Sequence, residues 1–89
     1  MRFEFNEAKN QLNRQKHGIT LSEAQKLWAA IGVEFDLGIV NGEYRYMRVG
    51  PMLGDVYLAV FTFRGGSIRL ISARKATAAE KVKYEQARR

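Results

Sequence analysis

The 89-residue sequence contains no cysteine and only one histidine. Without cysteine, the chain has no disulfide, no thiolate nucleophile and no cysteine-based zinc site. One histidine is too few for a conventional zinc site, and no Asp-x-Asp or clustered carboxylates indicate magnesium. We therefore expect neither a metal nor another cofactor.

Long hydrophobic runs and common nucleotide or hydrolase motifs are also missing. No apolar run approaches the roughly 20 residues that span a bilayer, and the first residues, MRFEFNEAKNQ, are too polar for a secretory signal. Gly65-Gly66-Ser67 is too short for a P-loop, and no Gly-x-Ser-x-Gly motif occurs. We expect a cytoplasmic protein with a single domain, residues 1–89, and no membrane partner.

The excess positive charge is confined to the last part of the chain. Residues 64–89 contain eight Lys or Arg and two Glu, a net charge of +6, whereas residues 1–63 contain seven basic and seven acidic residues, a net charge of zero. Charge concentrated in this way favours an anion-binding surface, and RNA or DNA is the obvious partner. An acidic protein partner also fits the pI of about 10.0.

The first third of the sequence predicts a short strand and two helices. The alternation of residues 3–5 is typical of a strand. Asn6 is a suitable N-cap for a helix that runs through about Lys16, with Gly18 as its left-handed stop. A capping box, Thr20-Leu21-Ser22-Glu23, opens a second helix that ends at about Ala30. Its inward stripe is expected to consist of Leu21, Ala24, Leu27 and Trp28.

The remainder predicts four strands, over 33–40, 43–50, 55–64 and 67–74, and a final helix. Asn41-Gly42 and Gly65-Gly66 indicate tight hairpins, and Pro51 with Gly54 indicates a looser connection. A second capping box at Thr77 opens a helix to about Ala87. The order predicts an α+β fold: a curved antiparallel sheet of about four strands, packed on one face by the two N-terminal helices, with a C-terminal helix at its edge.

The Gly65-Gly66 turn sets which side chains share a face. In a two-residue hairpin Arg64 faces Ser67, Thr62 faces Arg69, and Val60 faces Ile71. Arg64 and Arg69 are then diagonal neighbours, and these convergent donors suit a phosphate. The alternative is that both arginines pair with carboxylates or extend into water. The opposite face is expected to lie under the helices, with Tyr57, Phe61, Phe63, Ile68 and Leu70.

The sequence resembles the BrnT-type toxins in three separated motifs. The segment TFRGGSIRLISARKATAAEKVKYEQ is similar to that family's C-terminal signature, Arg-Gly-x-x-Ile-Arg, then Ile-Ser-Ala-Arg, then Glu and Tyr on the last helix. The opening, FEFNEAKNQLNRQKHGITLSEA, is similar to its aromatic strand and Lys-His-Gly helix end. Glu43-Tyr44-Arg45 after Gly42 resembles its Gly-Glu-x-Arg strand. Phe63 departs from the pattern, because the family often has Glu before that Arg.

The resemblance implies a RelE-like fold and the toxin half of a type II toxin–antitoxin pair. Such toxins are metal-independent ribonucleases that inhibit translation and growth by cutting RNA. Their antitoxin, BrnA, has a ribbon-helix-helix part that binds DNA and represses the shared operon. The implied partners are therefore RNA and a BrnA-type antitoxin, in a complex of two toxins and two antitoxins, with DNA contacted only through that complex.

RNA cleavage without a metal uses the 2′-hydroxyl as nucleophile and needs proton transfer and stabilisation of the phosphorane. Fixed guanidiniums suit the second task, so Arg64 and Arg69 are the first candidates. For proton transfer the candidates are His17, Glu43, Lys16 and Tyr84. Supporting phosphate contacts are expected from Lys16, Arg45, Arg74 and Lys75.

Each proton-transfer candidate has a structural alternative. His17 suits the negative end of a helix dipole, and Lys16 beside it is a solvated residue in the alternative interpretation. Glu43 is placed to pair with Arg45 on the same strand face, and Tyr84 is placed to pack on the sheet. Two other functions also remain open. One is a non-catalytic module that binds nucleic acid or an antitoxin and acts in operon autoregulation, and the other is a structural interaction protein whose charge only aids solubility.

Overall fold

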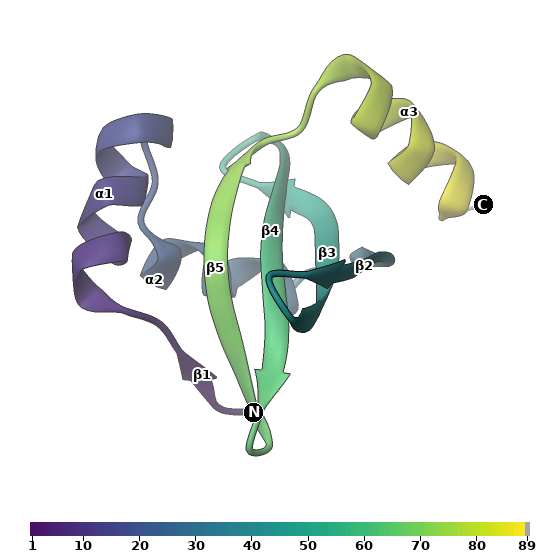
Figure 1. Cartoon of the computed structure of the whole chain (residues 1–89). Coiled ribbons are helices and arrows are strands. Elements are labelled where there is room, and N and C mark those ends of the chain that lie inside the picture. Colours follow the sequence, from purple (N-terminus) through teal and green to yellow (C-terminus); the bar gives the residue numbers. More distant parts are fainter. Residues whose placement is uncertain (89) are drawn as a thin grey trace.

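The structure is a computed structural model, and it describes residues 1–88. Its elements in chain order are β1 (Phe3–Glu4), α1 (Glu7–His17), α2 (Leu21–Ala24), a 3-10 helix η1 (Gln25–Trp28), β2 (Val33–Val40), β3 (Glu43–Met52), β4 (Asp55–Arg64), β5 (Ser67–Lys75) and α3 (Ala78–Ala87). The strands form one five-stranded sheet in the order β1-β5-β4-β3-β2 (Figure 1). The predicted α+β class is confirmed. No helix within these residues is long and apolar enough to cross a membrane.

The sheet is mixed, which differs from the expected antiparallel sheet of about four strands. Strands β2 to β5 pair antiparallel, but β1 pairs parallel with β5, with Phe3 opposite Ile68 and Glu4 opposite Arg69. The difference has a topological cause. The helices that follow β1 carry the chain across the sheet, so β1 is left beside the last strand, which has the same direction. That neighbour is more than 60 residues away, and no local pattern announces it.

Three tight turns connect the four antiparallel strands. Asn41-Gly42, Leu53-Gly54 and Gly65-Gly66 each have two consecutive positive φ angles, which is the geometry of a type I′ turn. The predicted looser connection around Pro51 is therefore wrong. Strand β3 continues through Pro51, which pairs with Val56, and Leu53 takes a left-handed conformation (φ 53°) that leucine rarely adopts.

The helix ends follow the predicted caps, except after the second helix. The Asn6 side chain accepts a hydrogen bond from the Lys9 backbone, and both capping boxes form, at Thr20 and at Thr77. However, α2 makes one turn and continues as η1 only to Trp28, not to Ala30. The Arg48 side chain of β3 explains this early end, because it donates hydrogen bonds to the carbonyls of Leu27 (2.8 Å) and Ala30 (3.1 Å).

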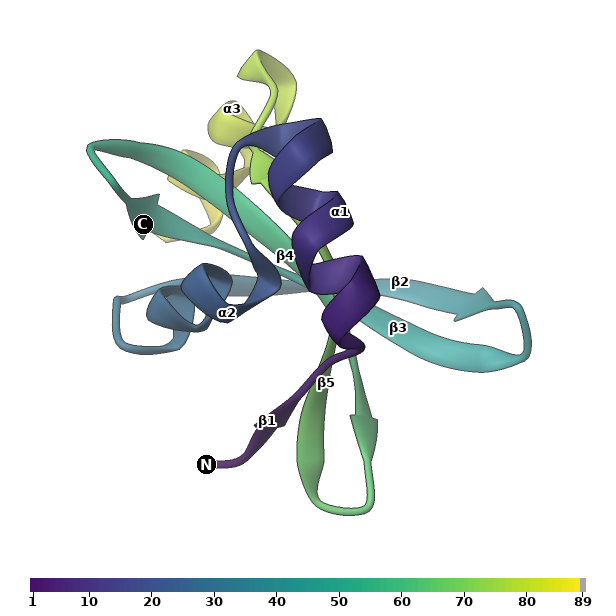
Figure 2. The same cartoon turned by 90° about the vertical axis from the view of Figure 1, so that its left-hand side faces the viewer.

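The two faces of the sheet bury different cores. On one face α1, α2 and η1 pack on the sheet. The buried core there consists of Ile19, Leu21, Ala24, Leu27, Met52, Tyr57, Ala59, Phe61, Ile68, Leu70 and Ala73, and Trp28 packs against it. On the other face Tyr84 of α3 packs with Val49 and Leu58. Figure 1 shows α1 and α3 on opposite sides of the sheet, and in Figure 2, seen from the α1 side, α3 lies behind α1. The C-terminal helix therefore covers the second face and does not sit at the sheet edge as predicted.

Two details of the predicted β4–β5 hairpin need correction. Phe63 is 57% exposed, because it lies near the turn, beyond the helices that cover its neighbours. The register holds near the turn, where Thr62 pairs with Arg69 and Arg64 with Ser67, but Val60 pairs with Ser72. A bulge leaves Ile71 as an extra residue in β5, so the predicted pairing of Val60 with Ile71 is wrong.

Candidate functional site

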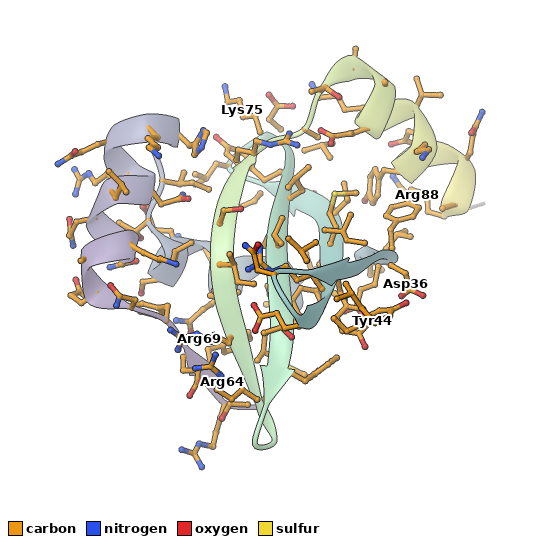
Figure 3. The ribbon with its side chains drawn as sticks, viewed as in Figure 1. Asp36, Tyr44, Arg64, Arg69, Lys75 and Arg88 are labelled. Carbon is orange, nitrogen blue, oxygen red and sulfur yellow. The ribbon has the colours of Figure 1, made fainter. Side chains whose placement is uncertain are left out.

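Arg64 and Arg69 come together on one face of the sheet, near the turn between β4 and β5 (Figure 3). Their register places both on the face opposite Ile68 and Phe61. Both approach the same carboxylate oxygen, Glu4 Oε1, which lies 4.0 Å from Arg64 Nε and 3.5 Å from Arg69 Nη1. Two guanidiniums from neighbouring strands thus converge on one point.

Strand β3 adds a second carboxylate and a third arginine. Glu43 Oε2 lies 4.0 Å from Arg64 Nη2, and Glu43 Oε1 lies 3.2 Å from Arg45 Nη2. We call Glu4, Glu43, Arg45, Arg64 and Arg69 the arginine cluster. Its three cations and two carboxylates leave a net charge of +1, and its members come from four strands. The predicted Glu43–Arg45 pair is present and is part of this larger group.

Glu4 was missed by the sequence analysis. The alternation of Phe3, Glu4 and Phe5 already puts Glu4 on the face opposite the two phenylalanines. What was lacking was the neighbour, because only the parallel pairing with β5 sets Glu4 beside Arg69. The alternative that the arginines pair with carboxylates is therefore realised in part.

The contacts to Glu4 are loose. Strong charge-assisted hydrogen bonds measure about 2.7–2.9 Å, and those from Arg64 and Arg69 to Glu4 measure 4.0 Å and 3.5 Å. The Arg64 side chain is 57% exposed. Both guanidiniums therefore keep donors that a phosphate can reach.

Lys75 lies at the other end of β5, away from the arginine cluster (Figure 3), and Arg74 precedes it on that strand. Arg74 makes two short hydrogen bonds to Glu80 of α3, at 2.8 and 3.0 Å. These bonds lower the pKa of Glu80 to about 2. Lys75 lies 3.9 Å from Asp55, which also binds Lys81 at 2.8 Å. The structure thus does not bring Arg74 and Lys75 to the cluster, and Arg74 fastens α3 to the sheet.

Tyr84 is buried and does not reach the arginine cluster either. Its side chain packs with Val49 and Leu58 and is only 3% exposed. Its hydroxyl donates to the Ile31 carbonyl at 3.5 Å, and the Arg88 guanidinium lies over its ring. Tyr84 is therefore not placed to exchange a proton with a substrate held at the arginine cluster. The ring is a core residue, as its structural alternative had it.

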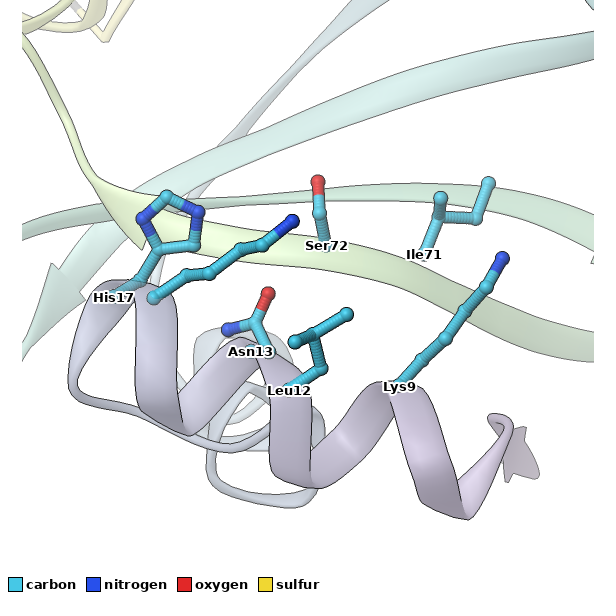
Figure 4. A pocket seen from close by; sticks show the side chains of 7 residues that line it. Lys9, Leu12, Asn13, His17, Ile71 and Ser72 are labelled. Carbon is cyan, nitrogen blue, oxygen red and sulfur yellow. The ribbon is translucent and has the colours of Figure 1, made fainter.

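His17 and Lys16 lie in a separate pocket of about 210 Å³ between α1 and β5 (Figure 4). The pocket is also lined by Lys9 and Ser72. Residue Glu4 lies just before the start of α1, whereas His17 ends it, and a helix of 11 residues is about 16 Å long. His17 is thus not placed to exchange a proton with a substrate held by Arg64 and Arg69.

Among residues 1–88 no three His, Asp or Glu side chains are grouped so that they could hold a metal ion. The arrangement at the arginine cluster offers instead a set of cationic donors beside two carboxylates. Chemically, that combination is able to bind a phosphodiester and to accept a proton from a group next to it.

A protein-family model described as the ribonuclease toxin BrnT of a type II toxin–antitoxin system matches residues 5–80. The chain belongs to this family. Searches of curated proteins and of solved structures gave no significant match. The BrnT match covers four of the five cluster residues and ends before Tyr84; Glu4 lies one residue outside it. Membership of a BrnT toxin family implies ribonuclease activity and an antitoxin partner at the level of the family.

Proposed function

We propose that this chain is a metal-independent endoribonuclease of the cytoplasm that cuts RNA at the arginine cluster and thereby inhibits translation and growth. The observation that carries the proposal is the convergence of Arg64 and Arg69 on one sheet face, 4.0 and 3.5 Å from a shared Glu4 oxygen. Two guanidiniums that approach one point can each bind a non-bridging oxygen of the same phosphodiester.

In the proposed reaction the 2′-oxygen of the ribose attacks the phosphorus. Glu43 takes the 2′-hydroxyl proton as the O2′–P bond forms, and Arg64 and Arg69 stabilise the negative charge that grows on the phosphorane oxygens. The P–O5′ bond then breaks, and the 5′-oxygen takes a proton from water. The products are a 2′,3′-cyclic phosphate and a 5′-hydroxyl end. Arg45, 3.2 Å from Glu43, holds that carboxylate in place for this role.

Glu4 has a different role in this proposal. It sits between two cations that repel one another and so holds both in place before RNA arrives. Because its contacts are longer than strong hydrogen bonds, an incoming phosphate can replace it. Glu4 is therefore a positioning residue, and Glu43 is the proposed base.

The direct test is cleavage of a labelled RNA by the purified chain in the presence of EDTA. We expect cleavage to persist with the chelator and to fall by about 10²–10³-fold in Arg69→Ala. Arg88→Ala is the control, since Arg88 is an exposed arginine just after α3 and outside the cluster. Cleavage that stops with EDTA and returns with a divalent ion contradicts the proposal.

The proposed partner is a BrnA-type ribbon-helix-helix antitoxin, in a complex of two toxins and two antitoxins that contacts DNA only through the antitoxin. The net charge of +6 favours an acidic segment, and the edge strand β2 exposes Leu37, Ile39 and Val40. The discovery of a short ribbon-helix-helix reading frame next to the gene is the result expected from this partner. Co-purification of the two products, with the mass of the complex measured by light scattering, tests it.

A second candidate function is a non-catalytic module that binds RNA or the antitoxin. Two observations favour it: the cluster contains no histidine, and Glu4 offsets part of the arginine charge. This function predicts tight RNA binding without cleavage, and weaker binding in Arg64→Ala.

A further inference from the structure

We propose that the pocket between α1 and β5 is a second phosphate-binding site. It binds the RNA strand at a phosphate other than the one whose bond is cut. We call it the α1–β5 pocket and define it by Lys9, Lys16, His17 and Ser72. The proposal rests on the proposed function for the identity of the strand, but the pocket itself is argued from its own geometry.

The pocket exists because part of the β5 edge is left uncovered. Strand β1 pairs with β5 only as far as Arg69, and the bulge at Ile71 follows at once. Helix α1 lies beside this free segment and is fixed to it by the buried Asn13. The Asn13 side chain donates to the carbonyls of Ala73 (2.9 Å) and Ile19 (2.8 Å) and accepts from the Ala73 backbone N–H (3.1 Å). The width of the pocket is thus set by hydrogen bonds and does not depend on a ligand.

The positive charge in the pocket has no counterpart. Lys9 and Lys16 are seven residues apart, so two turns of α1 place them on the same helix face, and both line the pocket. The Lys9 side chain extends toward β5 (Figure 4). In the described part of the chain neither lysine lies within 4.0 Å of a carboxylate, and no carboxylate lines the pocket. Each arginine of the cluster, in contrast, has a glutamate within that distance.

The helix dipole explains only part of this arrangement. A cation at the C-terminal end of a helix is favourable, which accounts for Lys16 and His17. Lys9 lies in the first turn, where a cation is unfavourable, yet its ammonium is directed to the same pocket. An anion bound in the pocket by both lysines offsets this unfavourable position of Lys9.

The remaining walls suit a nucleotide. Ser72 adds a hydroxyl that forms no hydrogen bond with a residue of the described chain, and Leu12 and Ile71 add an apolar surface for a ribose or base. Ser72 follows Arg69 by three residues on β5, which is about 10 Å along a strand. A single RNA strand that crosses the free edge of β5 therefore reaches both sites.

The test measures binding without cleavage. A fluorescent 2′-O-methyl RNA oligonucleotide has no free 2′-hydroxyl, so its anisotropy reports affinity alone. We expect Lys9→Ala/Lys16→Ala to bind more weakly than the wild-type chain and to lower the slope of log K against log salt by about 1.4, since each lost contact to a single strand removes about 0.7. The control, Lys26→Ala/Lys83→Ala, removes the same charge from exposed residues elsewhere and is expected to keep the slope.

A second readout locates the ligand. His17 is the only histidine, so its imidazole gives a single set of NMR signals. We expect the oligonucleotide to shift these signals in the wild-type chain and in Arg69→Ala, and to leave them unshifted in the double-lysine variant. Equal loss of affinity in both double variants, or signals that do not respond to RNA, overturn the proposal.

Two further arms identify the source of the phosphate. The first arm titrates inorganic phosphate and follows the His17 signals. An affinity for phosphate equal to that for the oligonucleotide overturns the assignment to RNA in favour of a free phosphate. The second arm uses an acidic peptide. If Lys9→Ala/Lys16→Ala loses binding to the peptide but keeps its affinity for RNA, the assignment to RNA is overturned in favour of a protein partner. Failure of the pocket and failure of the proposed function can be told apart. If RNA binding depends on the two lysines but the chain does not cut ordinary RNA, only the proposed function is wrong. If the chain cuts RNA and the double-lysine variant keeps the wild-type affinity, only the pocket proposal is wrong.

Discussion

The two ends of the β4–β5 ladder both carry arginines beside glutamates, and the way they pair differs. At the α3 end Arg74 and Glu80 form a one-to-one pair with two hydrogen bonds of 2.8 and 3.0 Å. At the turn end three arginines share two glutamates, and both contacts of Arg64 measure 4.0 Å. A short and complete pair holds structure together, whereas loose and incomplete pairing leaves donors for a ligand. The length of the ion-pair contacts and the number of glutamates per arginine therefore distinguish a structural arginine from arginines available to a ligand better than exposure or sequence does.

The largest expected effect is on cleavage and compares the carboxylates of the two ends. Glu43→Gln removes the proposed base and is expected to lower the single-turnover rate by about 10²–10⁴-fold. Glu80→Gln is the matched control at the α3 end and is expected to change the rate less than twofold, because Glu80 contacts Arg74 and the start of α3. Rates are measured on a labelled RNA in EDTA. Equal rates for wild type and Glu43→Gln assign the base elsewhere.

The next effect is on stability and concerns the side chain that joins α1 to β5. Asn13→Ala leaves the Ala73 N–H and two carbonyls without partners, in a site that is 6% exposed. We expect the free energy of unfolding to fall by about 2–4 kcal/mol. Urea denaturation measures it, and Gln15→Ala, an exposed change on the same helix, is expected to alter it by less than about 0.5 kcal/mol. A small effect for Asn13→Ala means that α1 is held by its apolar contacts alone.

How far the sequence predicts this molecule depends on the distance between interacting residues. The Gly65-Gly66 turn correctly predicts that Arg64 pairs with Ser67 and Thr62 with Arg69, because the register of a two-residue hairpin depends on neighbouring residues only. The capping boxes at Thr20 and Thr77 were predicted for the same reason. Glu4 was missed, since its place in the cluster depends on a parallel pairing across most of the chain.

Face and end were harder to predict than register. The short helix α3 carries no strong apolar stripe, so nothing local determined which sheet face Tyr84 would enter. His17 was grouped with the arginines by motif, and the structure separates them by the length of α1. The bulge at Ile71, which opens the α1–β5 pocket, has no glycine or proline to mark it.

The pH dependence of stability provides a finer test of the comparison. Because the hydrogen bonds from Arg74 lower the pKa of Glu80 from 4.5 to about 2 in the folded chain, folding favours the ionised form. The resulting stabilisation is complete above pH 4.5 and is lost as the pH falls from 4.5 toward 2. After allowance for solvent screening we expect about 2 kcal/mol.

Glu80→Gln isolates this contribution, because glutamine can still accept the Thr77 backbone hydrogen bond of the capping box. Urea denaturation of both proteins between pH 7 and pH 3 measures it. The wild-type chain is expected to lose its advantage over the variant as the pH drops. A difference that stays constant with pH shows that the Arg74–Glu80 pair contributes through packing and not through charge.

The smallest expected effect concerns Tyr84, the candidate that the structure moves from the site to the core. Tyr84→Phe keeps the ring against Val49 and Leu58 and removes only a hydroxyl whose hydrogen bond to Ile31 is long, at 3.5 Å. We expect the free energy of unfolding to change by less than about 1 kcal/mol and the cleavage rate to change less than twofold. Tyr84→Ala, in contrast, removes the ring and is expected to destabilise the chain by about 3 kcal/mol or more. A large loss of cleavage in a stably folded Tyr84→Phe variant would mean that the Tyr84 hydroxyl takes part in the reaction and that α3 moves when RNA binds.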